Sequence, residues 1–189
     1  MRRPSFAVVA VVVAAVFAVG CAHEPSPLPT MREAKALSAA EAGEIVREAA
    51  RRGEDELIAG LLDAGAVVDA RDRRGFTPLI LAAYHDQLTT TQLLLSRGAD
   101  ACAKDNGGNT ALMGAAFKGN DDVVRRLLEE PCAVDEANGA GRTALMFAAL
   151  VGRSDVVKLL QERGADQTVT DVDGKTAADW AATQGTSLP

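Results

Sequence analysis

Residues 75–83 read GFTPLILAA, and this pattern returns three more times along the chain. It recurs as GNTALMGAA at 108–116, GRTALMFAA at 141–149 and GKTAADWAA at 174–182. The four copies are evenly spaced, and a period of about 33 residues is typical of repeat architectures. The Ala-Ala pair at 49–50 extends the same period toward the N-terminus. We therefore expect a stack of similar units.

Within one unit the sequence predicts two helices joined by a tight turn. Thr77-Pro78 marks the start of the first helix, because a threonine hydroxyl caps free N–H groups and proline fits the first turn. Gly119 supplies a left-handed residue between the two helices. Val123-Val124 and Leu127-Leu128 then have the spacing of a buried helical face. The order is turn, short helix, glycine turn, second helix and loop.

The segment Asp72-Arg73-Arg74-Gly75-Phe76-Thr77-Pro78-Leu79, followed by Ala82-Ala83 and Gly98-Ala99-Asp100, resembles the ankyrin repeat. This resemblance implies an all-α solenoid of stacked helix pairs, with short β-hairpin loops and a concave binding face. It makes 34–189 one ankyrin-repeat domain. The domain divides into an N-terminal capping unit at about 39–71, full repeats at about 72–104, 105–137 and 138–170, and a C-terminal capping unit at 171–189.

Three departures from the repeated pattern have structural consequences. Asp86 stands where the other units have glycine. Thr90 and Thr91 replace an apolar pair, so this second helix is expected to be the loosest part of the stack. Pro131-Cys132 replaces Gly-Ala, and proline cannot adopt a positive φ. The loop of that unit must therefore be built differently.

The N-terminus has the pattern of a secretion signal. Arg2 and Arg3 precede an apolar run from Phe6 to Val19. This run is shorter than the about 20 residues that span a bilayer, but it suits a signal-peptide core. Ala18-Val19-Gly20-Cys21 resembles the lipobox of bacterial lipoproteins, which implies acylation of Cys21. In that family, Ala22 after the cysteine implies the outer membrane. Ordinary cleavage to a soluble periplasmic protein is the alternative.

These features predict a lipoprotein signal peptide at 1–20 and a lipidated, proline-rich tether at 21–33. Pro25, Pro27 and Pro29 make the tether too stiff and polar to join a core. The expected product is a lipid-anchored protein of the bacterial periplasm, with the outer membrane favoured over the inner.

Cys102 and Cys132 remain if Cys21 is acylated, and both lie in loops of successive units. They form either a disulfide or two separate buried thiols, and the separate thiols are somewhat favoured because neighbouring units of this family stack about 10 Å apart. A metal site is not expected, because His23 and His85 are the only histidines and neither lies near a cysteine at ligand spacing.

Charge follows the repeat register. The chain carries 20 Lys and Arg against 26 Asp and Glu, and loss of Arg2 and Arg3 leaves a mature charge of −8. In ankyrin repeats, partners are usually bound by the hairpin tips and the ends of the first helices. In this chain those positions hold seven cations and two carboxylates, which is a net charge of +5. The rest of the mature chain then carries a net charge of −13. The candidate partner-binding residues are Arg51, Arg52, Arg73, Arg74, Phe76, Tyr84, His85, Phe117, Lys118, Arg142 and Lys175.

The expected function is recognition of an acidic surface on another protein, by a scaffold or adaptor that is monomeric by itself. An inhibitor or immunity-type protein, or a stabiliser of a periplasmic or secreted enzyme, is the alternative. Nucleic acid is not an expected partner of so acidic a chain. No catalytic pattern or cofactor motif is present, so an enzyme is not expected. Asp171-Val172-Asp173-Gly174 lacks the further ligands of a calcium loop and is expected to be a hairpin turn.

Overall fold

The computed structural model describes residues 37–185 and 187–188. The predicted signal peptide, Cys21 and the tether lie outside this range. Within the described residues the chain forms nine α-helices and no strand. They are α3 (Ala39–Arg52), α4 (Asp55–Asp63), α5 (Pro78–Tyr84), α6 (Leu88–Ser96), α7 (Ala111–Lys118), α8 (Asp121–Leu127), α9 (Ala144–Leu150), α10 (Ser154–Glu162) and α11 (Ala177–Ala182). No helix among these residues is long and apolar enough to cross a membrane.

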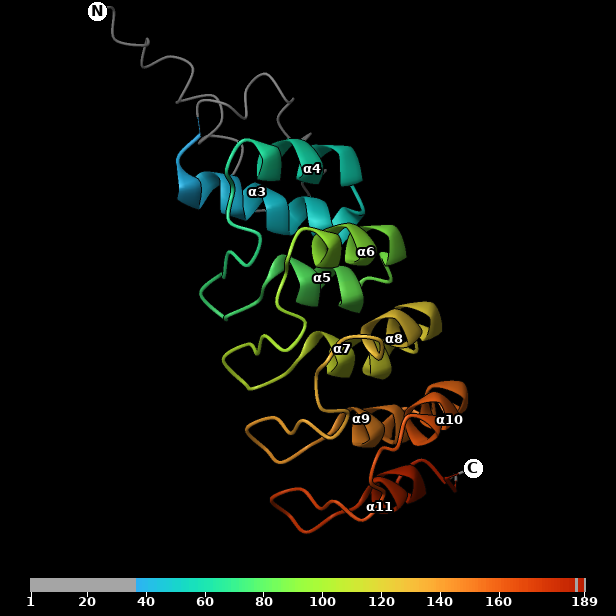
Figure 1. Ribbon diagram of the computed structural model, residues 1–189. Coiled ribbons are helices and arrows are strands. Elements are labelled where there is room, and N and C mark those ends of the chain that lie inside the picture. Colours follow the sequence, from blue (N-terminus) through green and yellow to red (C-terminus); the bar gives the residue numbers. More distant parts are fainter. Residues whose placement is uncertain (1–36, 186, 189) are drawn as a thin grey trace, which may run out of the picture.

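The helices form two parallel rows that run the length of the stack (Figure 1). The first helices of each pair, α3, α5, α7, α9 and α11, contact one another in that order. The second helices, α4, α6, α8 and α10, form the other row and also contact one another in order. Hairpin-shaped loops project from the same side of every unit (Figure 1). The predicted all-α solenoid of helix pairs is confirmed.

Each first helix after α3 begins at the predicted threonine. The side-chain oxygen accepts a hydrogen bond from the backbone N–H three residues later, at 3.2 to 3.4 Å. The four caps are Thr77 to Ile80, Thr110 to Met113, Thr143 to Met146 and Thr176 to Asp179. Since these bonds satisfy N–H groups that the helix itself leaves free, the period in the sequence fixes where each helix starts.

Small side chains let the first helices pack closely. The alanine pairs at 49–50, 82–83, 115–116 and 148–149 have exposed fractions of 0 to 2%. Branched and longer side chains of the second helices, such as Val123, Val124 and Leu94, are fully buried between the rows. The core is therefore one continuous strip along the stack, with each unit sharing its apolar surface with its neighbours.

The hairpins are held together by backbone hydrogen bonds between units. Asn106 N–H donates to the Arg74 carbonyl, Gly139 N–H to Gly107 and Val172 N–H to Ala140, at 2.8 to 3.0 Å. Within each hairpin an Asp or Asn side chain accepts two N–H groups of the turn, as Asp171 does from Asp173 and Lys175. The hairpins are thus closed by turn hydrogen bonds, and the predicted turn at 171–174 is present.

Close contact between hairpins explains why the turn glycines recur. A Cβ on Gly75 or Gly108 would lie 2.7 Å from a backbone nitrogen of the next hairpin, at Asn106 or Gly139. Both glycines also have a positive φ, of 83° and 82°. Gly174, in the last hairpin, has a φ of 73° but nothing within 4 Å of the corresponding Cβ position.

The Asp86, Thr90–Thr91 and Pro131 departures are visible in the structure. Asp86 has a φ of 61°, in the left-handed region that glycine occupies in the neighbouring units. Thr90 and Thr91 are both fully buried in α6; Thr90 donates to the Asp55 carboxylate, and the Thr91 hydroxyl has no hydrogen-bond partner among the described residues. Before Pro131, α8 ends at Leu127 after seven residues, whereas α4, α6 and α10 have nine. The expectation of a different loop there is confirmed.

Gly108→Ala and Gly174→Ala separate the two roles of the hairpin glycines. Gly174→Ala meets only the strain of a positive φ, and we expect it to lower the free energy of unfolding by about 1–2 kcal/mol. Gly108→Ala must also push the next hairpin away, so its cost should be at least about 1 kcal/mol larger. Urea denaturation followed by circular dichroism measures both. Equal costs would show that the hairpin contact contributes nothing.

Thr91→Val is expected to stabilise the stack by about 1 kcal/mol, because it removes an unsatisfied buried hydroxyl with little change of shape. Thr90→Val is the matched control. It removes the hydrogen bond to Asp55 and is expected to destabilise by about 1 kcal/mol. Opposite signs in thermal unfolding would support the structure around α6, whereas a destabilising Thr91→Val would contradict it.

Candidate interaction face

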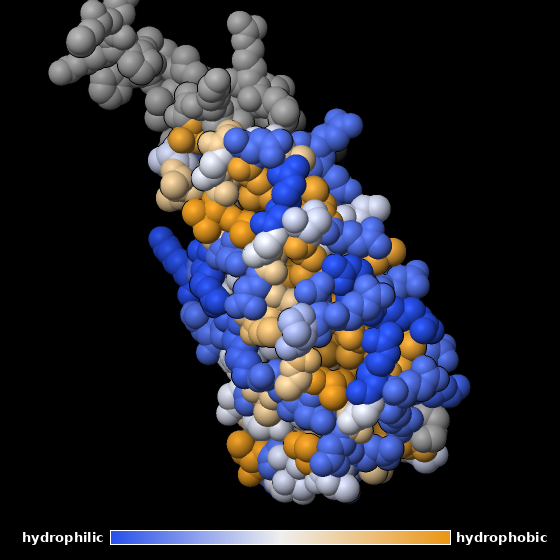
Figure 2. All heavy atoms as spheres, in the orientation of Figure 1, coloured by the Kyte–Doolittle hydropathy of each residue, from blue (hydrophilic) through white to orange (hydrophobic). Residues whose placement is uncertain are grey.

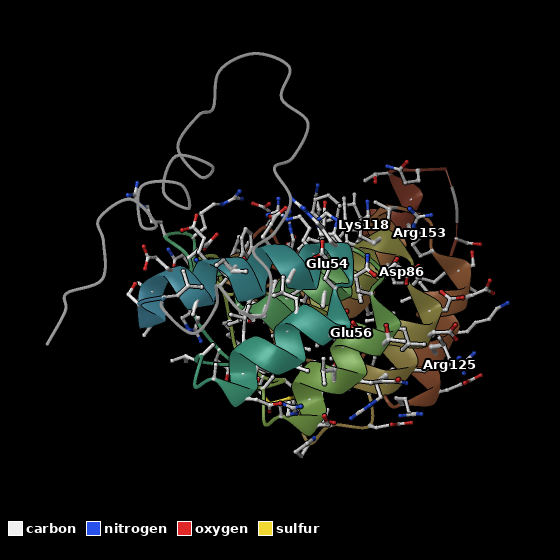
Figure 3. The ribbon with its side chains drawn as sticks, turned by 90° about the horizontal axis from the view of Figure 1, so that it is seen from above. Glu54, Glu56, Asp86, Lys118, Arg125 and Arg153 are labelled. Atoms are coloured by element: carbon white, nitrogen blue, oxygen red, sulfur yellow. A yellow bond between two sulfur atoms is a disulfide. The ribbon has the colours of Figure 1, made fainter. Side chains whose placement is uncertain are left out.

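The predicted partner-binding residues lie on the hairpins and along the ends of the first helices. The turns between the paired helices and the helix ends beside them carry both signs of charge. Figure 3 labels Glu54, Asp86 and Arg153 in the turns and Lys118 at the end of α7. Glu54 and Asp86 belong to the first two units, and Lys118 and Arg153 to the next two. This edge therefore carries both acidic and basic groups along its length.

In the first unit the cations are partly neutralised by Glu48, which does not occupy one of the predicted partner-binding positions. Glu48 lies one turn before Arg51 and Arg52 on α3. Its carboxylate is 3.0 Å from the Arg52 guanidinium and 3.7 Å from that of Arg51. Glu54 is a further partner of Arg52, at 3.8 Å. Arg51 and Arg52 therefore contribute less positive charge than the sequence count indicates.

The second unit presents free positive charge at its hairpin tip. Arg73 and Arg74 are exposed, and neither makes an ion pair within the described residues. The Arg74 guanidinium stacks over the half-buried Phe76 ring, 4.7 Å from its centroid. Stacking of this kind holds the guanidinium flat and leaves its N–H groups available to a carboxylate.

Tyr84 lies at the centre of the face, with an exposed fraction of 37%. Its ring leans toward the next unit, where a Cβ on Gly114 would lie 3.7 Å from it, and the Lys118 ammonium is 5.1 Å from the ring centroid. The His85 ring meets it edge-on at 5.3 Å. Tyr84 is thus an aromatic platform flanked by a cation from the next helix.

His85 is exposed and surrounded by charge. Partial burial of the imidazole lowers the pKa of His85, as do the nearby charges of Arg51 and Lys118, while Glu48 opposes them. Since the ordinary histidine pKa is already below 7, this imidazole is neutral at pH 7. His85 contributes hydrogen-bonding groups to the face at neutral pH, and no charge.

Phe117 is less available than the sequence indicates. It is half-buried and packs edge-to-face on Phe147 of the next unit, with ring centroids 6.2 Å apart. Phe147 was not among the predicted residues. It occupies the same register as Trp180, three residues before the Tyr84 register. Residues three apart share a helix face, so helical periodicity within one unit could have identified both.

At the C-terminal end, Arg142 and Lys175 enclose Trp180. Their cationic groups lie 4.4 and 4.5 Å from the centroid of its ring. Trp180 Nε1–H donates to the Asp171 carboxylate at 3.0 Å, and Arg142 lies 3.4 Å from the same carboxylate. Arg142 and Lys175, which are both half-buried, therefore help to organise the last unit.

The Asp171 carboxylate is the centre of that cluster. Its side chain is fully buried, and burial alone would raise its pKa. Hydrogen bonds from the N–H groups of Lys175 and Asp173 and from the Trp180 and Arg142 side chains outweigh this effect and lower the pKa. All of these hydrogen-bond donors belong to the chain itself. This agrees with the interpretation of Asp171 as a turn-forming residue.

Cys102 and Cys132 are joined in a disulfide, with their Cα atoms 5.6 Å apart. The somewhat favoured alternative of two separate buried thiols is therefore wrong in this structure. Cys102 is exposed and Cys132 is half-buried. The bond joins the loop of the second unit to the irregular loop around Pro131 in the third, so these loops approach more closely than the expected spacing of units indicates.

The face is a surface and not an enclosed site. Two recesses in the described residues have volumes of about 20 Å³, beside Cys132, and about 210 Å³, between the start of α3 and the end of α4. Small-molecule sites usually need about 300 Å³ or more. Within this part of the chain no group of three His, Cys, Asp or Glu side chains is placed to hold a metal ion. Figure 2 shows hydrophobic residues as separate patches between hydrophilic ones.

Comparison with known proteins agrees with this geometry. A family model described as ankyrin repeats (3 copies) matches residues 46–138 and 112–187. Among curated proteins, none matches this chain significantly. The two matched ranges together include α5 to α11 and most of the first helix pair. The chain therefore belongs to the ankyrin-repeat family.

Proposed function

We propose that this protein is a membrane-tethered periplasmic scaffold or adaptor that binds an acidic surface of another protein. Ankyrin repeats bind other proteins, and proteins of this family are typically interaction modules without enzymatic activity. The proposal adds to this general role a binding face, a kind of partner and a cellular location.

The observation that carries the proposal is the contrast between paired and unpaired cations. Arg51 and Arg52 share Glu48, and Arg142 lies against Asp171. Arg73 and Arg74 have no such carboxylate among the described residues, and the Lys118 ammonium lies over an aromatic ring. Among the predicted residues, the cations without an ion pair are therefore those of the second and third units, together with Lys175 of the last unit, whose ammonium lies over Trp180.

The same region supplies the apolar part of a binding site. Phe76 and Tyr84 lie beneath Arg74 and Lys118, so each cation sits above an aromatic surface. Arginine and tyrosine are enriched at the residues that dominate protein interfaces. A partner segment with Asp or Glu beside an apolar side chain matches this arrangement, since a guanidinium can bind a carboxylate with two parallel hydrogen bonds.

The test is a pull-down with residues 22–189 from periplasmic extract, comparing Arg73→Ala/Arg74→Ala with a control that removes the same charge. Arg125→Ala/Lys158→Ala is that control, because both residues are exposed on second helices, on α8 and α10. We expect the hairpin variant to weaken capture by about tenfold or more and the control to leave it unchanged.

Capture should also weaken as salt rises from about 50 to 500 mM, because exposed charges are screened. Equal retention by both variants would refute the binding face. An assay of the captured protein then separates the roles: lost activity indicates an inhibitor, and raised stability with activity intact indicates a stabiliser.

The proposal of a membrane tether is supported by other observations. The signal-like segment ends at Cys21, and the disulfide between Cys102 and Cys132 belongs to the kind that forms in oxidising compartments. Acyl chains on Cys21 would keep the stack near the membrane and raise its local concentration there.

Cys21→Ser is expected to move the protein from the membrane to the soluble fraction of a Gram-negative host, because the acylated thiol is removed. Incorporation of labelled fatty acid should be lost at the same time. Cys102→Ser is the matched control and should remain membrane-bound and labelled. A protein that is soluble without any substitution, or a Cys21→Ser variant that still takes up label, would contradict the lipoprotein assignment.

A further inference from the structure

The loops that follow the second helices are bridged from one unit to the next. The Asp69 carboxylate accepts the backbone N–H of Asp100, 31 residues later, at 3.1 Å. The Asp135 carboxylate accepts that of Asp166, also 31 residues later, at 3.0 Å. Both aspartates occupy one register, and Cys102 stands in that register between them.

At the middle junction the disulfide takes the place of the carboxylate bridge. Cys102 replaces the bridging aspartate, and Cys132 replaces the alanine found at 66, 99 and 165. The bond joins residues 30 positions apart, nearly the span of the two carboxylate bridges. The bridge in this register is thus covalent only at the middle one of the three junctions between successive loops.

The loop that contains Cys132 lacks a hydrogen bond that its counterparts have. In the other units the alanine N–H donates back to the last turn of the second helix: Ala66 to Leu61, Ala99 to Leu94 and Ala165 to Leu160, at 2.9 to 3.0 Å. Such a bond closes the helix end, and it needs the preceding glycine with a positive φ. Pro131 cannot take that conformation, and Cys132 N–H donates instead to Glu130 within the loop.

The ends of this loop are held by other contacts. Arg163 donates to the Leu128 carbonyl at 2.9 Å, and Lys104 lies 2.6 Å from the Glu136 carboxylate. Residues 129–134 lie between these anchors, and Glu130 pairs within its own unit with Arg126. We call this segment the Pro131 loop. The disulfide is its one covalent attachment to the second unit.

We propose that the Cys102–Cys132 disulfide is a redox-sensitive clamp, which a dithiol reductant opens to release the Pro131 loop from the second unit. A thiolate of the reductant attacks the sulfur of Cys102, which is an exposed residue, the sulfur–sulfur bond breaks, and Cys132 leaves as a thiolate. The second thiol of the reductant then displaces Cys102 from the mixed disulfide. Two electrons pass from the reductant, which becomes a disulfide, and the chain gains two thiols.

Release has a local effect, because the rest of the stack keeps its own contacts. The backbone bond from Gly139 to Gly107 and the ion pair of Lys104 with Glu136 still join the second and third units. The alanine pairs of α5 and α7 also remain buried. Reduction should therefore loosen the Pro131 loop without unfolding the repeats.

Hydrogen exchange tests the clamp without any partner. Residues 22–189 are compared before and after treatment with dithiothreitol, and mass spectrometry counts the thiols. The backbone amides of residues 129, 130 and 132–134 should exchange on the order of tenfold faster after reduction, because the loop loses its cross-link. The equivalent loop of the first unit, residues 63–68, should not change.

A variant that restores the common loop is the control. Cys102→Asp/Pro131→Gly/Cys132→Ala gives the third unit the glycine, alanine and bridging aspartate of its neighbours. Its exchange at 129–134 should be slow with or without dithiothreitol. A disulfide that resists dithiothreitol in the folded protein, or a reduced protein with unchanged exchange at 129–134, would overturn the clamp.

Discussion

Each helix pair in this protein buries its apolar surface only against the pairs beside it. The alanine pairs between first helices and the backbone hydrogen bonds between hairpins are both contacts of this kind. Stability in such a stack is approximately a sum of nearest-neighbour terms. A departure from the repeated pattern can therefore be compensated only at its own junction. Thr90, which bonds to Asp55 of the preceding unit, is one example.

The same dependence on neighbours shapes the binding face. Tyr84 lies against the backbone of the next first helix, and Phe117 packs on Phe147. Lys118 then lies over the Tyr84 ring, so a cation of one unit completes the surface of another. The face is made at the junctions between units, and its charge depends on which cations find a carboxylate there.

The sequence predicts the local features of the fold well. Threonine caps, turn glycines and alanine pairs act within a few residues, so the repeat period is enough to place them. The sequence predicts the residues of the binding face less well. The pairing of Arg52 with Glu48 and the enclosure of Trp180 by Arg142 and Lys175 depend on side-chain directions in three dimensions. The disulfide depends on a loop that departs from the period, so the period could not decide between a bond and two thiols.

The disulfide makes one junction of the stack depend on whether its surroundings are oxidising. A carboxylate bridge such as that of Asp69 forms wherever the chain folds, whereas a disulfide forms only where thiols are oxidised. The cross-linked junction lies between the second and third units, which the contact of Lys118 with Tyr84 also crosses. Because the alanine pairs of α5 and α7 stay buried when the proposed clamp opens, its redox state acts on the Pro131 loop at this junction and leaves the Tyr84 platform in place.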